Sequence, residues 1–63
     1  MNNIETSITN ILDQNALLNV HDLVAEVYSE LEDTAVVDIK ICLLKMAEDD
    51  ILGFDDSWRV FKK

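Results

Sequence analysis

Residues 43–63 read LLKMAEDDILGFDDSWRVFKK, and the hydrophobic pattern changes its period within this stretch. Up to Glu48 the apolar residues recur at the three- and four-residue spacing of a helix. After Asp50 come two short runs rich in β-forming residues, ILGF (51–54) and WRVF (58–61), separated by the polar link DDS. Two such runs around a short polar link predict a β-hairpin. The chain is therefore expected to end as a helix followed by a hairpin over about residues 51–61.

Strand alternation predicts which side chains of the second run share a face. Trp58 and Val60 are expected on one face, and Arg59 and Phe61 on the other. We expect Trp58 to close the core. The alternative is an outward-facing Trp58 that contributes to an interface, where tryptophan is favoured.

The helix that leads into the hairpin is predicted over about residues 34–49, with Asp33 or Thr34 as its N-cap. Its apolar residues form two stripes instead of one. The stripe that we assign to the core comprises Val36, Ile39, Leu43 and Met46. The second stripe comprises Val37, Ile41 and Leu44.

Two interpretations of the second stripe remain open. In the first, the helix packs on both sides, so that Val37, Ile41 and Leu44 are also core. In the second, they form an exposed strip that meets another protein or a second copy of the chain, since an apolar patch with a polar rim is typical of an interface. That rim would be formed by Asp38, Lys45 and Glu48.

The first half of the chain predicts two further helices. Ile4, Ile8, Ile11 and Leu12 mark one helical face over about residues 3–14, with Asn15 as a left-handed stop. ALLNV (16–20) is too short for another helix, and we expect it to pair or pack as a short extended link. Asn19 is then the expected N-cap of a helix over about residues 20–31. The stripe of this helix comprises Leu23, Val24, Val27, Tyr28 and Leu31.

The order helix, extended link, helix, helix, hairpin resembles that of a winged helix-turn-helix domain, and residues 43–63 resemble the end of many such domains. The chain is also loosely similar to the winged helix of the bacterial RNA polymerase delta subunit family. The matching pieces are His21-Asp22-Leu23-Val24 and Ser57-Trp58-Arg59-Val60, within about residues 16–63. The resemblance implies one α+β, mainly α, winged-helix-like domain over residues 1–63. Asp49-Asp50 stand where such domains often have glycine, and we expect an aspartate there to adopt the left-handed conformation.

The charge is strongly acidic and unevenly distributed. The chain has 63 residues, 49% of them hydrophobic, with 13 acids against 5 bases and a net charge of −8. Residues 1–33 hold seven acids and no base, residues 34–50 four acids and two bases, and residues 51–63 two acids and three bases. Because affinity for DNA depends largely on neutralised phosphates, nucleic acid is a disfavoured partner.

Residues for catalysis and for metal binding are scarce. The single histidine, His21, and the single cysteine, Cys42, lie on different predicted helices with no third group to orient either. We expect His21 to be a first-turn residue and Cys42 a partly buried apolar residue. We therefore expect no enzyme, metal, cofactor or small-molecule site. A missing signal peptide and a missing apolar span predict a soluble, cytoplasmic protein with no membrane partner.

These patterns leave three functional hypotheses. The first is a non-enzymatic acidic protein-interaction module, self-associating as a homodimer or docking on a larger protein and linked to transcription, with the surface Val37, Asp38, Ile41, Leu44 and Lys45. The first alternative is a winged-helix nucleic-acid-binding regulator that uses Lys40, Lys45, Arg59, Lys62 and Lys63. The second alternative is a small acidic, phage-like inhibitor whose carboxylates imitate DNA phosphates. The predicted third helix carries none of the usual mid-helix base readers, such as Arg, Asn or Gln, which favours the first hypothesis.

Overall fold

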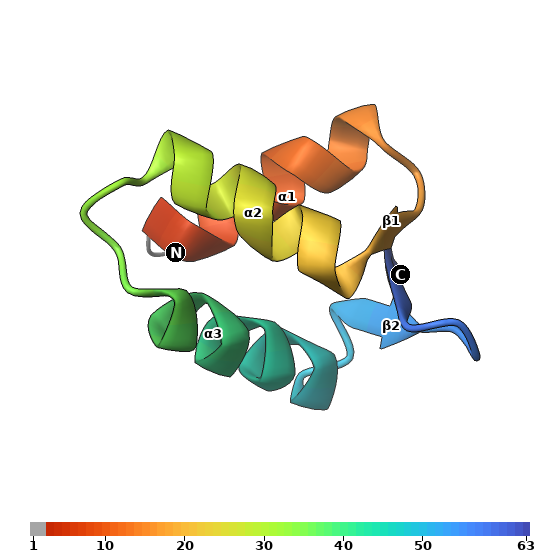
Figure 1. The fold of residues 1–63 in the computed structure, drawn as a ribbon. Coiled ribbons are helices and arrows are strands. Elements are labelled where there is room, and N and C mark those ends of the chain that lie inside the picture. Colours follow the sequence, from red (N-terminus) through yellow and green to blue (C-terminus); the bar gives the residue numbers. More distant parts are fainter. Residues whose placement is uncertain (1–2) are drawn as a thin grey trace.

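A computed structural model describes residues 3–63 as three helices and a small antiparallel sheet (Figure 1). The elements are α1 (Asn3–Gln14), β1 (Leu18–Asn19), α2 (Val20–Glu30), α3 (Val36–Glu48), β2 (Leu52–Phe54) and β3 (Arg59–Lys62). The sheet lies at the end of the helices where α2 begins and α3 ends. The predicted α+β, mainly helical, winged-helix-like fold is confirmed, and every predicted helix lies within two residues of its observed bounds.

The sheet has the order β1-β3-β2, so the last strand of the chain is the central one. Val60 on β3 pairs with Leu18 on one side and with Phe54 on the other. The predicted extended link is thus confirmed as an edge strand. Gly53 pairs with Phe61, whose ring atom Cζ lies 2.5 Å from the place where a Cβ of residue 53 would stand. The absence of a side chain at position 53 therefore allows this ring to cover β2.

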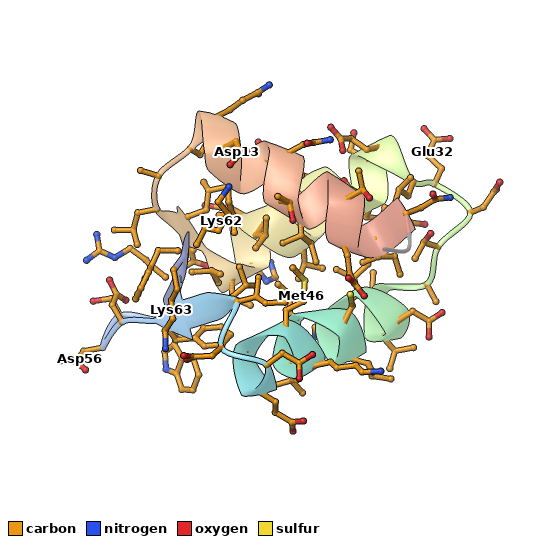
Figure 2. All side chains as sticks on the ribbon, turned by 180° about the vertical axis from the view of Figure 1, so that it is seen from behind. Asp13, Glu32, Met46, Asp56, Lys62 and Lys63 are labelled. Atoms are coloured by element: carbon orange, nitrogen blue, oxygen red, sulfur yellow. The ribbon has the colours of Figure 1, made fainter. Side chains whose placement is uncertain are left out.

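The core is a single apolar cluster to which all three helices, β2 and β3 contribute. Three of the four residues assigned to the core stripe of the third helix are buried as predicted: Ile39, Leu43 and Met46. Figure 2 shows Met46 in the interior, between α3 and the helices that face it. The prediction is wrong for Val36, which is 41% exposed because it opens the first turn of α3 at the edge of the helix contact. Cys42 is buried in the same face.

The two predicted N-caps have different outcomes. Asn19 caps α2 as expected, since its Oδ1 accepts the N–H of His21 at 2.8 Å. Neither Asp33 nor Thr34 caps α3. The N-cap is Ala35, which offers no side-chain hydrogen bond. Thr34 is instead part of the preceding turn, where its N–H donates to the carbonyl of Leu31.

The expected left-handed residue at the end of α3 is Asp50, with φ of 64°. Its N–H donates to the carbonyl of Ala47, and the N–H of Ile51 donates to the carbonyl of Met46. This pair of bonds is the Schellman motif that commonly ends helices, here with aspartate in the place that glycine usually takes. The same expectation is wrong for Asn15, which has no positive φ. Its side-chain Nδ2 and its N–H both donate to the carbonyl of Ile11 instead.

The hairpin turn is organised by one carboxylate. Asp55 Oδ1 accepts the N–H groups of Ser57 and Arg59, both at 2.9 Å, and Oδ2 pairs with Arg59 Nε at 2.8 Å. The hydrogen bond from the Arg59 N–H is the main reason why the pKa of Asp55 lies below its ordinary value of 3.8. The Ser57 N–H and the guanidinium charge act in the same direction.

We expect Asp55 to make the fold sensitive to acid. Because the pKa of this carboxyl is lower in the folded chain, its stabilising contribution is present above about pH 4 and is lost as the pH falls through the folded pKa. Thermal unfolding between about pH 6 and about pH 2 should show the melting temperatures of the wild type and Asp55→Asn converging as acid is added. Asp56→Asn is the control, because Asp56 is exposed at the tip of the hairpin and points away from the fold (Figure 2). A constant gap between wild type and Asp55→Asn would contradict this role.

Candidate protein-interaction surface

The second apolar stripe is exposed along its whole length. Val37, Ile41 and Leu44 are 60%, 57% and 61% exposed, respectively. At 3.6 residues per turn they project from the side of α3 opposite to Ile39, Leu43 and Met46. The interpretation that places them in the core is wrong, because α1, α2 and β2 all contact α3 from its buried side. We call Val37, Ile41 and Leu44 the α3 strip.

The rim of the α3 strip is charged but neutral in sum. Asp38 and Lys45 flank the strip on one side and Lys40 on the other, while Glu48 continues it toward the end of α3. All four side chains are exposed. Two acids and two bases leave no net charge on this face, in a chain whose net charge is −8.

A groove adjoins the α3 strip on the side of Lys40. It encloses about 560 Å³ between α2, the first turns of α3 and the hairpin. Its apolar walls come from Val24, Ala25 and Tyr28 on α2, Val36 on α3, and Trp58. The sequence gives little sign of this groove, because Tyr28 and Val36 fit the apolar stripes of their helices. Both side chains are nevertheless exposed at the edge of the helix contact.

Trp58 is 71% exposed, so the expectation that it closes the core is wrong. The reason is its backbone: φ is 59°, and the residue precedes β3, so it does not follow the alternation that buries Val60. The indole packs edge-on against Phe54, with ring centroids 6.4 Å apart. A bulky residue in the left-handed region is uncommon and strained. This exposed aromatic forms one wall of the groove.

The exposed large hydrophobic residues gather on this side of the molecule. Eight are exposed within residues 3–63, and six of these belong to the α3 strip or to the groove. Scattered exposed apolar residues are normal on a monomer, whereas a gathered patch with a polar rim is typical of an interaction site. The five residues predicted for partner binding, Val37, Asp38, Ile41, Leu44 and Lys45, are all exposed on the outer side of α3.

The five basic residues predicted for nucleic-acid binding differ in whether they form an ion pair. Arg59 pairs with Asp55, Lys62 with Asp13 and Lys63 with Asp50. Figure 2 shows Lys62 reaching from the sheet toward Asp13 on α1. Within the described residues, Lys40 and Lys45 on α3 make no ion pair. The charges of the hairpin and C-terminus are therefore already balanced by acids of the same chain, and only the two lysines of α3 are uncommitted.

Other kinds of site find little support in residues 3–63. No three His, Cys, Asp or Glu side chains of this part of the chain are grouped so that they would hold a metal ion. None of its helices has the length and the apolar character that crossing a membrane requires. Comparisons of the chain with protein-family models, with curated proteins and with solved structures find no match.

Proposed function

We propose that this protein is a non-enzymatic acidic interaction module, that it docks on a protein surface through the α3 strip, and that it acts in transcription. The observation that carries the proposal is the exposure of Val37, Ile41 and Leu44 on the face of α3 opposite to the core. Three aliphatic side chains in water on one face of a helix add nothing to the core of the domain. A partner that covers them would remove this apolar surface from water.

The strip offers a useful amount of binding free energy. Complete burial of a Val, Leu or Ile side chain contributes about 1.5–3 kcal/mol, and more than half of each of these three is still available. Covering all three would therefore supply on the order of 3–5 kcal/mol before the costs of association. The adjoining groove, with Tyr28 and Trp58, adds aromatic surface of the kind that often dominates interface energies.

The setting in transcription is supported by the resemblance to winged-helix domains, many of which bind DNA through the third helix. In this chain the corresponding helix presents Val37, Ile41 and Leu44 instead of base-reading side chains. A module that uses this helix to contact protein, either a second copy of the chain or a larger protein of the transcription apparatus, fits the presence of apolar residues where base readers would stand. It also fits the net charge of −8, which repels phosphate.

Site-specific photo-crosslinking tests the proposal. A benzophenone amino acid is placed at position 41, in the middle of the α3 strip, and the protein is irradiated in cells of its own source. We expect covalent adducts of one or a few defined masses, because a docked partner holds its surface within reach of this side chain. The adducts are identified by mass spectrometry, and an adduct with a second copy of the chain counts as a protein partner.

The matched control carries the same amino acid at position 26. Glu26 is exposed on α2 and lies on the side that faces α1, away from α3. Adducts that require position 41 support docking through the strip. No adduct at position 41, or the same adducts at positions 41 and 26, would contradict it.

A further inference from the structure

We infer that the occupant of the α3 strip is a second copy of this chain, whose own α3 packs antiparallel to the first. The inference rests on the proposed function, because it names the partner of the same strip. It is carried by the order of apolar and charged residues along the exposed face of α3, and by the charge of the chain as a whole.

The spacing of the exposed face is that of a coiled-coil seam. Val37, Ile41, Leu44 and Glu48 follow one another at intervals of four, three and four residues. Intervals of three and four residues are those between the a and d positions of a seven-residue repeat, which lie along the contact between two helices. One flank of the seam then carries Asp38 and Lys45, and the other flank carries Lys40 and Ala47.

An antiparallel pair of these helices matches opposite charges. A two-fold axis across the helices brings each flank against the same flank of the other copy. When Ile41 packs beside Leu44 of the second copy, Asp38 comes opposite Lys45 of that copy. The symmetry repeats this contact, so that two opposite-charge pairs border the seam. On the other flank, Lys40 comes opposite Ala47 and close to Glu48 of the second copy.

A parallel pair of the same helices matches like charges. In a parallel coiled coil, each residue on one flank faces a residue of the opposite flank on the other helix, about one turn further along. That rule places Lys40 of each copy near Lys45 of the other, and the symmetry doubles the repulsion. The residues bordering the strip therefore select the antiparallel arrangement.

The charge distribution also favours a second copy over a strongly basic partner. Asp38, Lys40, Lys45 and Glu48 cancel one another, so this face gives a basic surface nothing to attract it. The excess acids lie elsewhere, seven of them within residues 1–33. Among the faces of an acidic molecule, a neutral face is the one at which a second acidic copy meets the least repulsion.

The dimer is expected to be weak and dependent on concentration. Three aliphatic side chains per copy cover much less than the ~800 Å² per partner of a standard stable interface. We expect a dissociation constant on the order of 0.1 mM. Sedimentation equilibrium of the isolated chain between about 10 µM and about 1 mM should show the average mass rising from monomer toward dimer.

Charge exchange on one flank tests the arrangement. Asp38→Lys and Lys45→Asp should each weaken association about tenfold, because each turns two attractive contacts into repulsive ones. The double variant, and also an equimolar mixture of the two single variants, should associate as the wild type does, because opposite charges again face each other. Circular dichroism checks that each variant folds, which is expected since both side chains are exposed.

Asp38→Lys separates this arrangement from a general effect of charge. It brings the net charge of the chain nearer to zero, so simple repulsion between acidic molecules predicts tighter association. The antiparallel pairing predicts weaker association. Tighter or unchanged association of Asp38→Lys would overturn the inference, as would single variants whose mixture does not associate.

The failures of the two proposals are distinguishable. A wild-type chain that remains monomeric to about 1 mM, while position 41 crosslinks to a different protein, overturns the inference and leaves the proposed function standing. A dimer that Leu44→Asp does not weaken lies on another surface, and this also overturns the inference. A monomeric chain with no adduct at position 41 overturns both.

Discussion

Replacing Ile39 with alanine is expected to lower the free energy of unfolding by about 3 kcal/mol. Ile39 is 0% exposed and is the fourth residue of α3, within the core cluster. The substitution removes three buried carbon atoms and leaves a cavity, since the surrounding helices relax only in part. A core of this size rarely supplies more than ~3–5 kcal/mol, so we expect a large fraction of the variant to be unfolded at physiological temperature.

Ile41→Ala is the matched control for this loss. It removes the same atoms from the same helix two residues further along, at a side chain that projects into water. We expect the free energy of unfolding to change by no more than about 0.5 kcal/mol. Urea denaturation of both variants, at concentrations where the chain is monomeric, measures the difference. Similar losses for Ile39→Ala and Ile41→Ala would mean that both sides of α3 are buried, contrary to the 57% exposure of Ile41.

Replacing Leu52 with alanine is expected to lower the free energy of unfolding by a similar amount, about 3 kcal/mol. Leu52 is the first residue of β2, is 1% exposed and belongs to the same cluster as Ile39. The large effect is expected because β2 contacts α3, so the hairpin completes the core of the domain. A hairpin that were merely appended to a helical domain would tolerate this change.

Leu44→Ala is the control for Leu52→Ala, because it shortens the same type of side chain at an exposed position of α3. We expect a change of no more than about 0.5 kcal/mol. Thermal unfolding followed by the far-ultraviolet circular dichroism of the helices reports the result. If Leu52→Ala left the helical transition unchanged while the signal of Trp58 changed, the hairpin would unfold on its own and would not be part of the core.

The elements of the fold follow from local chemistry, which is why the sequence predicts them well. The change of period after Asp50 separates helix from hairpin, and Asn19 places the start of α2 through a bond to a neighbouring N–H. Asp50 ends α3 through bonds within its last turn. The bonds of Asn19 and of the last turn of α3 join residues no more than five positions apart. The residues of the α3 strip could likewise be named, because helical periodicity alone separates them from the core stripe.

The hydrophobic pattern of the sequence does not determine which surfaces of the helices and strands stay exposed in the fold. A helix with two apolar stripes is compatible with burial of one stripe or of both. The decision comes from the packing of α1, α2 and β2, which all contact α3 from its buried side and leave its outer side bare. The groove beside it arises only where α2, α3 and the hairpin meet.

The hairpin shows the same limit at single residues. The sequence predicted that Trp58 follows the alternation of a strand, but a positive φ at this residue turns its side chain out of the core. From the sequence, the basic side chains near the C-terminus were predicted to be available to bind phosphate. In the structure Lys62 instead pairs with Asp13, which is 49 positions away in the chain. Helical periodicity and helix capping depend on residues that are close in the chain, so the sequence alone determined them. The exposure of a side chain, and an ion pair between residues far apart in the chain, depend on how distant segments pack together. Only the tertiary structure decided these.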